Sequence, residues 1–252
     1  SPNGTYDYML TGNNETLNVT FTDTNLDSCW YNYNGTNISI PGCLTGVKNS
    51  TSFLYELDNN NLTVYANDSF GNLNSIFTSW EYKLTEVNQT YSAETIEGSL
   101  ETFLAHTKLG SGISIEDAVL FNYNDSQTTG QAFTSGGYDI LRKANYLVPS
   151  VTADTNFTFY WAVTLSDSTE INLSSQNQTV YNLAVDNCSS YTVELYNFSV
   201  IDEEEQTALT GVTIETALNF YDEARSEIVF NYSNQFEGVN PLRICLNRNI
   251  TN

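Results

Sequence analysis

Basic residues are scarce in this sequence. The 252 residues include 8 lysines and arginines against 30 aspartates and glutamates, which gives a formal net charge of −22. A nucleic-acid phosphate backbone would repel such a chain, so we expect no nucleic-acid partner. Anionic membrane surfaces are disfavoured for the same reason. High salt is one explanation of an acidic, lysine-poor surface, although most of the polarity comes from uncharged Asn, Ser and Thr.

Histidine is almost absent, and several catalytic motifs are missing altogether. The single histidine, His106, and the lack of any CxxC spacing leave a zinc site without enough ligands. No nucleophile elbow, phosphate-binding loop or dinucleotide-binding glycine motif occurs. His106 is therefore interpreted as a hydrogen-bonded histidine on a sheet surface, and we expect the chain not to be an enzyme.

Long apolar runs are also missing. No stretch of about 18 apolar residues is available to span a membrane, and the opening SPNGTYDYML has no signal-peptide pattern. We interpret the chain as a processed form or an excised piece of a longer protein. The C-terminal RICLNRNITN is strand-like, which favours the same interpretation.

Short alternating segments are abundant instead. Hydrophobic residues make up 40% and aromatics 13% of the chain, enough for packed cores. In LNVTF, the apolar residues Leu17, Val19 and Phe21 share one face and Asn18 the other. NLTVYAND places Leu62, Val64 and Ala66 on one face, and SIFTSW alternates at Ile76, Thr78 and Trp80. Strands with turn signals every 8–12 residues are typical of a β-sandwich.

The strand segments divide into three predicted domains, residues 1–84, 85–186 and 187–252. The first holds about seven short strands, with a hairpin turn predicted at Asn34-Gly35. In the second, the segment IEGSLETFLAHTKLG also fits a short amphipathic helix through Leu100, Phe103 and Leu104. We favour a strand there because its neighbours are β and its threonine content is high.

The first 80 residues carry a family resemblance. The SPNGTY opening, the SCWY strand and the VYANDSFGN strand and turn resemble Ig-like repeats of secreted surface proteins of archaea and bacteria. Similar units occur in virion and tail-fibre proteins of uncultured environmental phages. The resemblance implies an all-β chain of tandem Ig-like antiparallel β-sandwich domains, serving as a spacer, adhesin or appendage component.

The C-terminal region carries weaker resemblances. One resemblance is to small prealbumin-like β domains attached to surface proteins. It rests on the order of a strand, the DEE turn, TALTG and a second strand. YNFSVIDEEEQTAL and PLRICLNRNITN resemble proteins of marine phages, which implies a virion or surface component and no chemistry. About 66 residues are few for a complete sandwich, so this domain is either incomplete or shares a sheet with its neighbour.

Four cysteines, Cys29, Cys43, Cys188 and Cys245, allow three disulfide pairings. Cys29–Cys43 with Cys188–Cys245 is favoured because it keeps each bridge inside one predicted domain. Four buried free thiols are the alternative. The disulfide interpretation implies an oxidising, extracytoplasmic setting. Together with the resemblances above, it implies an extracellular location at a cell surface or a virion surface.

Asn-x-Ser/Thr triplets occur more than twice as often as this composition gives by chance. They favour N-linked glycans as surface modifications, while asparagine- and threonine-rich turns that generate triplets by composition are the alternative. The triplets begin at Asn3, Asn14, Asn18, Asn34, Asn37, Asn49, Asn61, Asn67, Asn88, Asn124, Asn156, Asn172, Asn177, Asn187, Asn197, Asn231 and Asn249.

Acidic clusters are the remaining candidates for chemistry. A glycosidase needs two facing carboxyl groups, and the candidates, all expected in turns, are Glu116-Asp117, Asp202 to Glu205 and Asp222-Glu223. Asp202, Glu203 and Glu204 are a weak calcium candidate. A solvated hairpin turn is favoured, because no DxDxDG spacing is present. No other cofactor is expected.

Trp30 directly follows Cys29 and is expected to pack in a core beside a disulfide. Taken together, the features favour an extracellular structural or adhesive protein that associates with itself or with other surface or virion proteins. Edge strands with few lysines favour association by strand addition. A carbohydrate- or receptor-binding module is the alternative, with a host glycan or receptor as partner.

Overall fold

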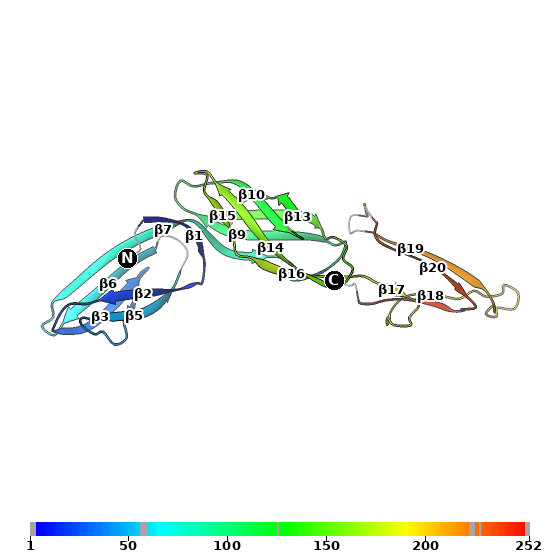
Figure 1. Ribbon diagram of the computed structural model, residues 1–252, viewed down its shortest axis with the longest axis horizontal. Helices are drawn as coiled ribbons and strands as arrows, with labels where there is room; N and C mark the ends of the chain where they lie inside the picture. The colour runs from blue at the N-terminus through cyan, green and yellow to red at the C-terminus, as the bar shows by residue number, and fades with distance from the viewer. Residues whose placement is uncertain (1–3, 56–59, 125, 222–224, 227, 250–252) are drawn as a thin grey trace.

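The computed structural model describes residues 4–55, 60–124, 126–221, 225–226 and 228–249. All regular structure in this part of the chain is β, which confirms the all-β prediction. Figure 1 shows an elongated molecule in which three modules follow one another along the longest axis. Within the described residues no helix is long and apolar enough to cross a membrane.

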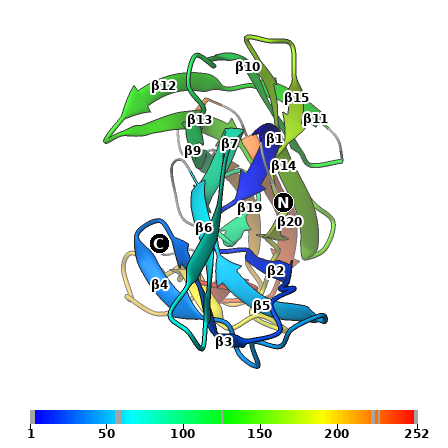
Figure 2. The ribbon, with the colours of Figure 1, turned by 90° about the vertical axis from the view of Figure 1, so that its left-hand side faces the viewer.

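The first module is a two-sheet sandwich. One sheet has the order β1-β7-β6-β3-β4 and faces the pair β2-β5, an Ig-like arrangement in which β1 runs parallel to β7. Figure 2 shows the β2-β5 pair apart from β6 and β7. The strands are β1 (Gly4–Leu10), β2 (Asn14–Thr20), β3 (Leu26–Tyr33), β4 (Thr36–Ser39), β5 (Lys48–Leu54), β6 (Asn60–Asp68) and β7 (Leu73–Thr90).

Alternation decides which residues enter this core. Leu62 and Val64 are buried, and Leu17 and Val19 pack on the same cluster, as the sequence predicts. Asn34 and Gly35 both have positive φ and join β3 to β4 as a two-residue turn. This geometry matches the strand twist and is the hairpin turn expected from Asn-Gly.

The prediction for Trp30 is wrong. Neighbouring residues of a strand point to opposite faces, so Trp30 lies on the outer face while Cys29 points inward. There Trp30 stacks on Tyr65 at 5.2 Å between ring centroids. The tryptophan that fills this core is Trp80, which is 3% exposed.

The second module is also a sandwich. The C-terminal half of β7 continues into the sheet β7-β9-β13-β12, and the facing sheet has the order β11-β10-β14-β16-β8 with β15 beside β14. The strands are β8 (Glu94–Ile96), β9 (Leu100–Leu109), β10 (Ile115–Asn122), β11 (Ser126–Thr129), β12 (Gln131–Ser135), β13 (Tyr138–Leu147), β14 (Thr155–Leu165), β15 (Glu170–Asn172) and β16 (Gln176–Tyr181).

β9 occupies the segment for which a helix was the alternative. Phe103, Ala105 and Thr107 are buried at every second position, the period of a strand. Phe103 and Ala105 share one apolar cluster with Leu120, Phe159 and Trp161 of the opposite sheet.

The third module is the smallest. The sheet β17-β21-β18 lies against the two-stranded sheet β19-β20, and Phe236, Leu242 and Ile244 form the buried centre between them. None of its strands joins a sheet of the second module, so within the described residues the two do not share a sheet. The strands are β17 (Val185–Asp186), β18 (Val193–Phe198), β19 (Thr213–Tyr221), β20 (Ile228–Glu237) and β21 (Leu242–Leu246).

The predicted boundary between residues 84 and 85 falls inside β7. This strand pairs with β6 in the first module and with β9 in the second, while β1 pairs with it across the junction from Gly4↔Trp80 to Leu10↔Glu86. The first two modules are therefore joined by a continuous strand instead of a linker. The boundary at 186/187 falls at the end of β17, which pairs with β21 of the third module.

Candidate functional site

Lys83 lies on β7 where the first module meets the second. Its ammonium is 2.9 Å from an Asp7 carboxylate oxygen on β1 and 2.8 Å from one of Asp167, in the turn before β15. It also donates a hydrogen bond of 2.7 Å to the Thr169 hydroxyl. One cation thus holds the edge strand of the first module and a turn of the second to the shared strand.

This cluster predicts an acid-dependent stability. The hydrogen bond from Lys83 is the largest cause that lowers the pKa of Asp167 from 3.8 to about 2, followed by those from Thr169. Since the folded pKa lies below the unfolded one, the stabilisation is present above about pH 4 and is lost as the pH falls toward 2. In Lys83→Met we expect the melting temperature to fall less steeply over this range than in the wild type.

Calorimetry at a series of pH values measures this difference. Lys48→Met is the matched control, because Lys48 is exposed at the start of β5. In this variant the melting temperature should fall with decreasing pH as steeply as in the wild type. An unchanged slope in Lys83→Met would contradict the assignment.

Glu86 is a second polar contact between the first two modules. Its carboxylate is 1% exposed and accepts hydrogen bonds from the Tyr8 hydroxyl and from the Gln89 amide. It also accepts bonds from the backbone N–H and the hydroxyl of Ser174, which precedes β16. Burial, then the Glu86 carboxylate, raises the pKa of Tyr8, so its phenol stays a donor.

The junction of the second and third modules is held by polar contacts too. The Arg248 guanidinium donates to both Asp154 carboxylate oxygens at 2.8 and 2.9 Å and lies 4.2 Å from the Tyr181 ring centroid. The Asn247 side chain accepts from the Ala184 N–H and donates to the Asn182 carbonyl.

Glu97, 4% exposed, fixes the adjoining turns of the second module. Its carboxylate accepts bonds from the N–H groups of Val151 and Leu183 and from the Asn182 amide. We did not predict Lys83, Glu86 or Glu97 from the sequence. For Glu86 the available signal was a charged residue at an inward position, in the series Trp80, Leu84, Glu86.

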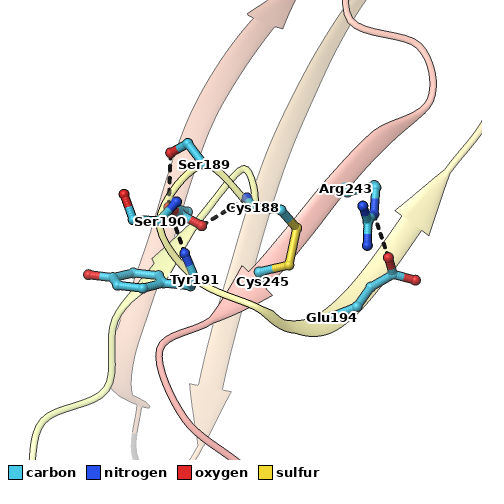
Figure 3. The surroundings of a disulfide bond; sticks show 8 residues. Cys188, Ser189, Ser190, Tyr191, Glu194, Arg243 and Cys245 are labelled. Atoms are coloured by element: carbon cyan, nitrogen blue, oxygen red, sulfur yellow. Dashed lines mark hydrogen bonds and ion pairs between the residues drawn. A yellow bond between two sulfur atoms is a disulfide. The ribbon is translucent and has the colours of Figure 1, made fainter.

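The structure pairs the cysteines as Cys29–Cys43 and Cys188–Cys245, the pairing that the sequence favours. Figure 3 shows the second bridge between the loop after β17 and strand β21. Beside it the Arg243 Nε donates to a Glu194 carboxylate oxygen at 2.5 Å. Disulfides of this kind are typical of extracellular domains.

The candidate chemical residues do not gather. His106 lies on the face of β9 opposite Phe103 and edge-on to Tyr138. Its Nδ1 has no hydrogen-bond partner among the described residues, which does not fit the expected hydrogen-bonded histidine. Glu116 and Asp117 lie exposed on β10, where a register shift marks a bulge, and not in a turn. Asp222 and Glu223 lie outside the described residues.

The acidic run is a turn, as expected. The Asp202 carboxylate accepts the N–H groups of Glu204 and Glu205 at 2.8 and 2.9 Å, and these bonds lower its pKa. Within the described part of the chain no group of three or more His, Cys, Asp or Glu side chains is arranged to hold a metal ion. The Asp202 oxygen is used to close the turn.

The triplet asparagines are mostly accessible. Asn34 and Asn67 are half-buried, and Asn3 lies outside the described residues. Asn49 is 5% exposed, and its amide donates to the carbonyls of Leu44 and Val47, so the fold uses the atom that a glycan would need. The exposed ones are Asn14, Asn18, Asn37, Asn61, Asn88, Asn124, Asn156, Asn172, Asn177, Asn187, Asn197, Asn231 and Asn249.

A groove opens along one side of the first module. It has a volume of about 790 Å³ and lies between β2 and the N-terminal half of β7. Buried Phe53, Leu62 and Val64 contribute to its lining, together with Leu17 and Val19 of β2. Ile76, which alternation predicts to share a face with Trp80, lies at the groove and is 63% exposed.

No protein-family model matches the sequence, and no curated protein sequence matches it. Solved structures that align with it include the fibronectin(III)-like modules of Clostridium thermocellum CbhA, at 12% identity over 72% of this chain and 91% of that one, with a TM-score of 0.30. The titin I-band fragment I67-I69 aligns at 10% identity over 94% and 86%, with a TM-score of 0.29.

A Bacteroides ovatus glucan-utilisation protein, SGBP-B, solved in complex with a mixed-linkage heptasaccharide, aligns at 11% identity over 90% of this chain and 65% of that one, with a TM-score of 0.24. The strand order and pairing of the chain itself carry the Ig-like fold assignment.

Proposed function

We propose that this chain is an extracellular structural or adhesive protein, a component of a cell-surface layer, a filament or a virion appendage. The observation that carries the proposal is β7, a single strand of 18 residues that belongs to the sheets of two successive modules. Bending at this junction would require breaking ladder hydrogen bonds and the Lys83 contacts. A chain built this way transmits force and keeps its ends apart.

Three further features support the proposal. Two disulfides close loops in the first and third modules. Thirteen triplet asparagines of the described residues are exposed and offer positions for N-linked glycans. These glycans, with the net charge of −22, would keep a surface protein soluble. The resemblance of the first 80 residues to repeats of archaeal and bacterial surface proteins, and to phage virion proteins, points the same way. Other surface or virion proteins are the proposed partners.

Glycopeptide mass spectrometry of native material, with immunogold labelling of intact cells or particles, tests this proposal. We expect label at the outer surface and glycans within the exposed set, for example at Asn61. Asn49 should be unmodified, because its amide is buried and donates two backbone hydrogen bonds. A native protein that is unglycosylated and confined inside cells would overturn the proposal.

A carbohydrate- or receptor-binding module is the second candidate function. One observation favours it: Tyr196 and Phe198 of β18, each 45% exposed, stack with ring centroids 5.6 Å apart. Paired exposed rings suit contact with a sugar or a protein surface. Binding of the intact protein to a glycan array would favour this function over a purely structural one.

A further inference from the structure

The groove of the first module is bordered by two strand edges. β2 pairs with β5 alone, and residues 73–77 of β7 pair with β6 alone, within the described part of the chain. Strand β1 covers β7 only from Trp80 onward. Each open edge presents backbone N–H and C=O groups that a further strand could bond.

The lining of the groove is suited to a strand. Leu17 and Val19 project from one border, Ile76 from the other, and Leu62 and Val64 lie buried between them. These positions recur at every second residue of their strands, so an occupant with apolar side chains at alternate positions would place them all into the groove. The borders, five to seven residues long, set the length of such a segment.

The charge at the groove indicates whether its occupant is a second copy of this chain or a different protein. Among the described residues, those with charged side chains at the groove are Asp7 and Glu15, both acidic. Lys83 pairs with Asp7, whereas no ion pair within the described residues involves Glu15. A second copy would bring a further net charge of −22 to an acidic border. A partner segment with a lysine or arginine beside Glu15 gains attraction instead.

We propose that this groove binds an extended β-strand segment of another protein, apolar at alternate positions and basic at its end, which completes the first module by strand addition. This inference rests on the proposed function, because it names how the chain would be joined to its neighbours in an assembly. Backbone hydrogen bonds along the edges would hold the segment, and its apolar side chains and basic end would select it.

The test uses a short synthetic peptide of alternating valine and threonine with a lysine at each end, bound to the full chain and followed by fluorescence anisotropy. Hydrogen exchange should show new protection at residues 14–20 and 73–77. Ile76→Glu should weaken binding by about tenfold or more, because it buries a charge against an apolar occupant. Glu15→Gln should weaken it less and make it less dependent on salt.

Phe77→Glu is the matched control. Phe77 is 63% exposed like Ile76 and is its neighbour on β7, but it is not part of the groove lining. Its substitution should leave peptide affinity unchanged. No binding by the wild type, or equal losses in the two glutamate variants, would overturn the proposal while the surface location and glycans stand unaffected.

Self-association of the wild-type chain, measured without peptide, is the remaining test. Sedimentation over a concentration series should show a monomer. Concentration-dependent oligomers that disappear in Ile76→Glu and persist in Phe77→Glu would assign the groove to a second copy and overturn the assignment to another protein.

Discussion

Removing the Cys188–Cys245 disulfide is expected to unfold the third module and leave the first two folded. The bridge closes a loop with a sequence separation of 57, and restricting the unfolded chain over that length contributes about 4 kcal/mol. The apolar centre that would have to replace it is small. Among the described residues the third module buries three residues in its cluster against twelve in the second.

The variant Cys188→Ala/Cys245→Ala tests this by hydrogen exchange resolved along the chain. Protection should be lost in β18–β21 and kept in β9 and β14. The matched control, Cys29→Ala/Cys43→Ala, opens a loop with a separation of 14, worth about 3 kcal/mol, in a module with a larger aromatic core. Equal protection of the third module with and without its disulfide would contradict the prediction.

The second large effect is expected at Glu86. The Glu86 carboxylate accepts four hydrogen bonds at a site that is 1% exposed, and truncation to alanine removes it. The donor groups of Tyr8, Gln89 and Ser174 then lose this acceptor. Buried donors without partners cost about 1–3 kcal/mol each. With partial rearrangement we expect Glu86→Ala to lower the free energy of unfolding by about 3–5 kcal/mol.

Urea denaturation measures this loss. Glu86→Gln keeps the size of the side chain, but its amide NH2 is a hydrogen-bond donor and would face other donors. We therefore expect about half of the loss in unfolding free energy to remain. Glu81→Ala is the control on the same strand. Within the described residues the Glu81 carboxylate accepts one hydrogen bond, an exposed one from the Thr5 hydroxyl, so Glu81→Ala should lower the free energy of unfolding by no more than about 0.5 kcal/mol. A Glu86→Ala variant as stable as Glu81→Ala would contradict the structural role of the carboxylate.

Local pattern was sufficient for much of the fold. Alternation identified the inward faces of β2 and β6, and the Asn34-Gly35 pair identified a hairpin whose two positive φ angles need those residues. Keeping each bridge inside one predicted domain gave the disulfide pairing. The strand faces and the hairpin depend on interactions within a few residues or on counting along one strand, and the pairing depends on the division into domains.

The same reasoning failed in two ways. Trp30 was expected beside Cys29 in the core, although local strand geometry turns adjacent residues to opposite faces. The other failures lie where a distant segment decides. The junction at β7 was expected to be a boundary, because nothing local tells whether a strand of 18 residues serves one sheet or two. Lys83 and Asp167 lie 84 positions apart and meet only through the fold.

The sequence by itself determined the all-β class, the strand faces, the accessible asparagines as a group and an acidic surface, because these follow from side-chain period and composition. Tertiary structure decided which of those faces are covered. Trp80 and Ile76 share one alternating face of β7, yet one is 3% and the other 63% exposed. β1 pairs with β7 from Trp80 onward and no second strand lies beside residues 73–77 in the described chain, so the open groove exists only in three dimensions.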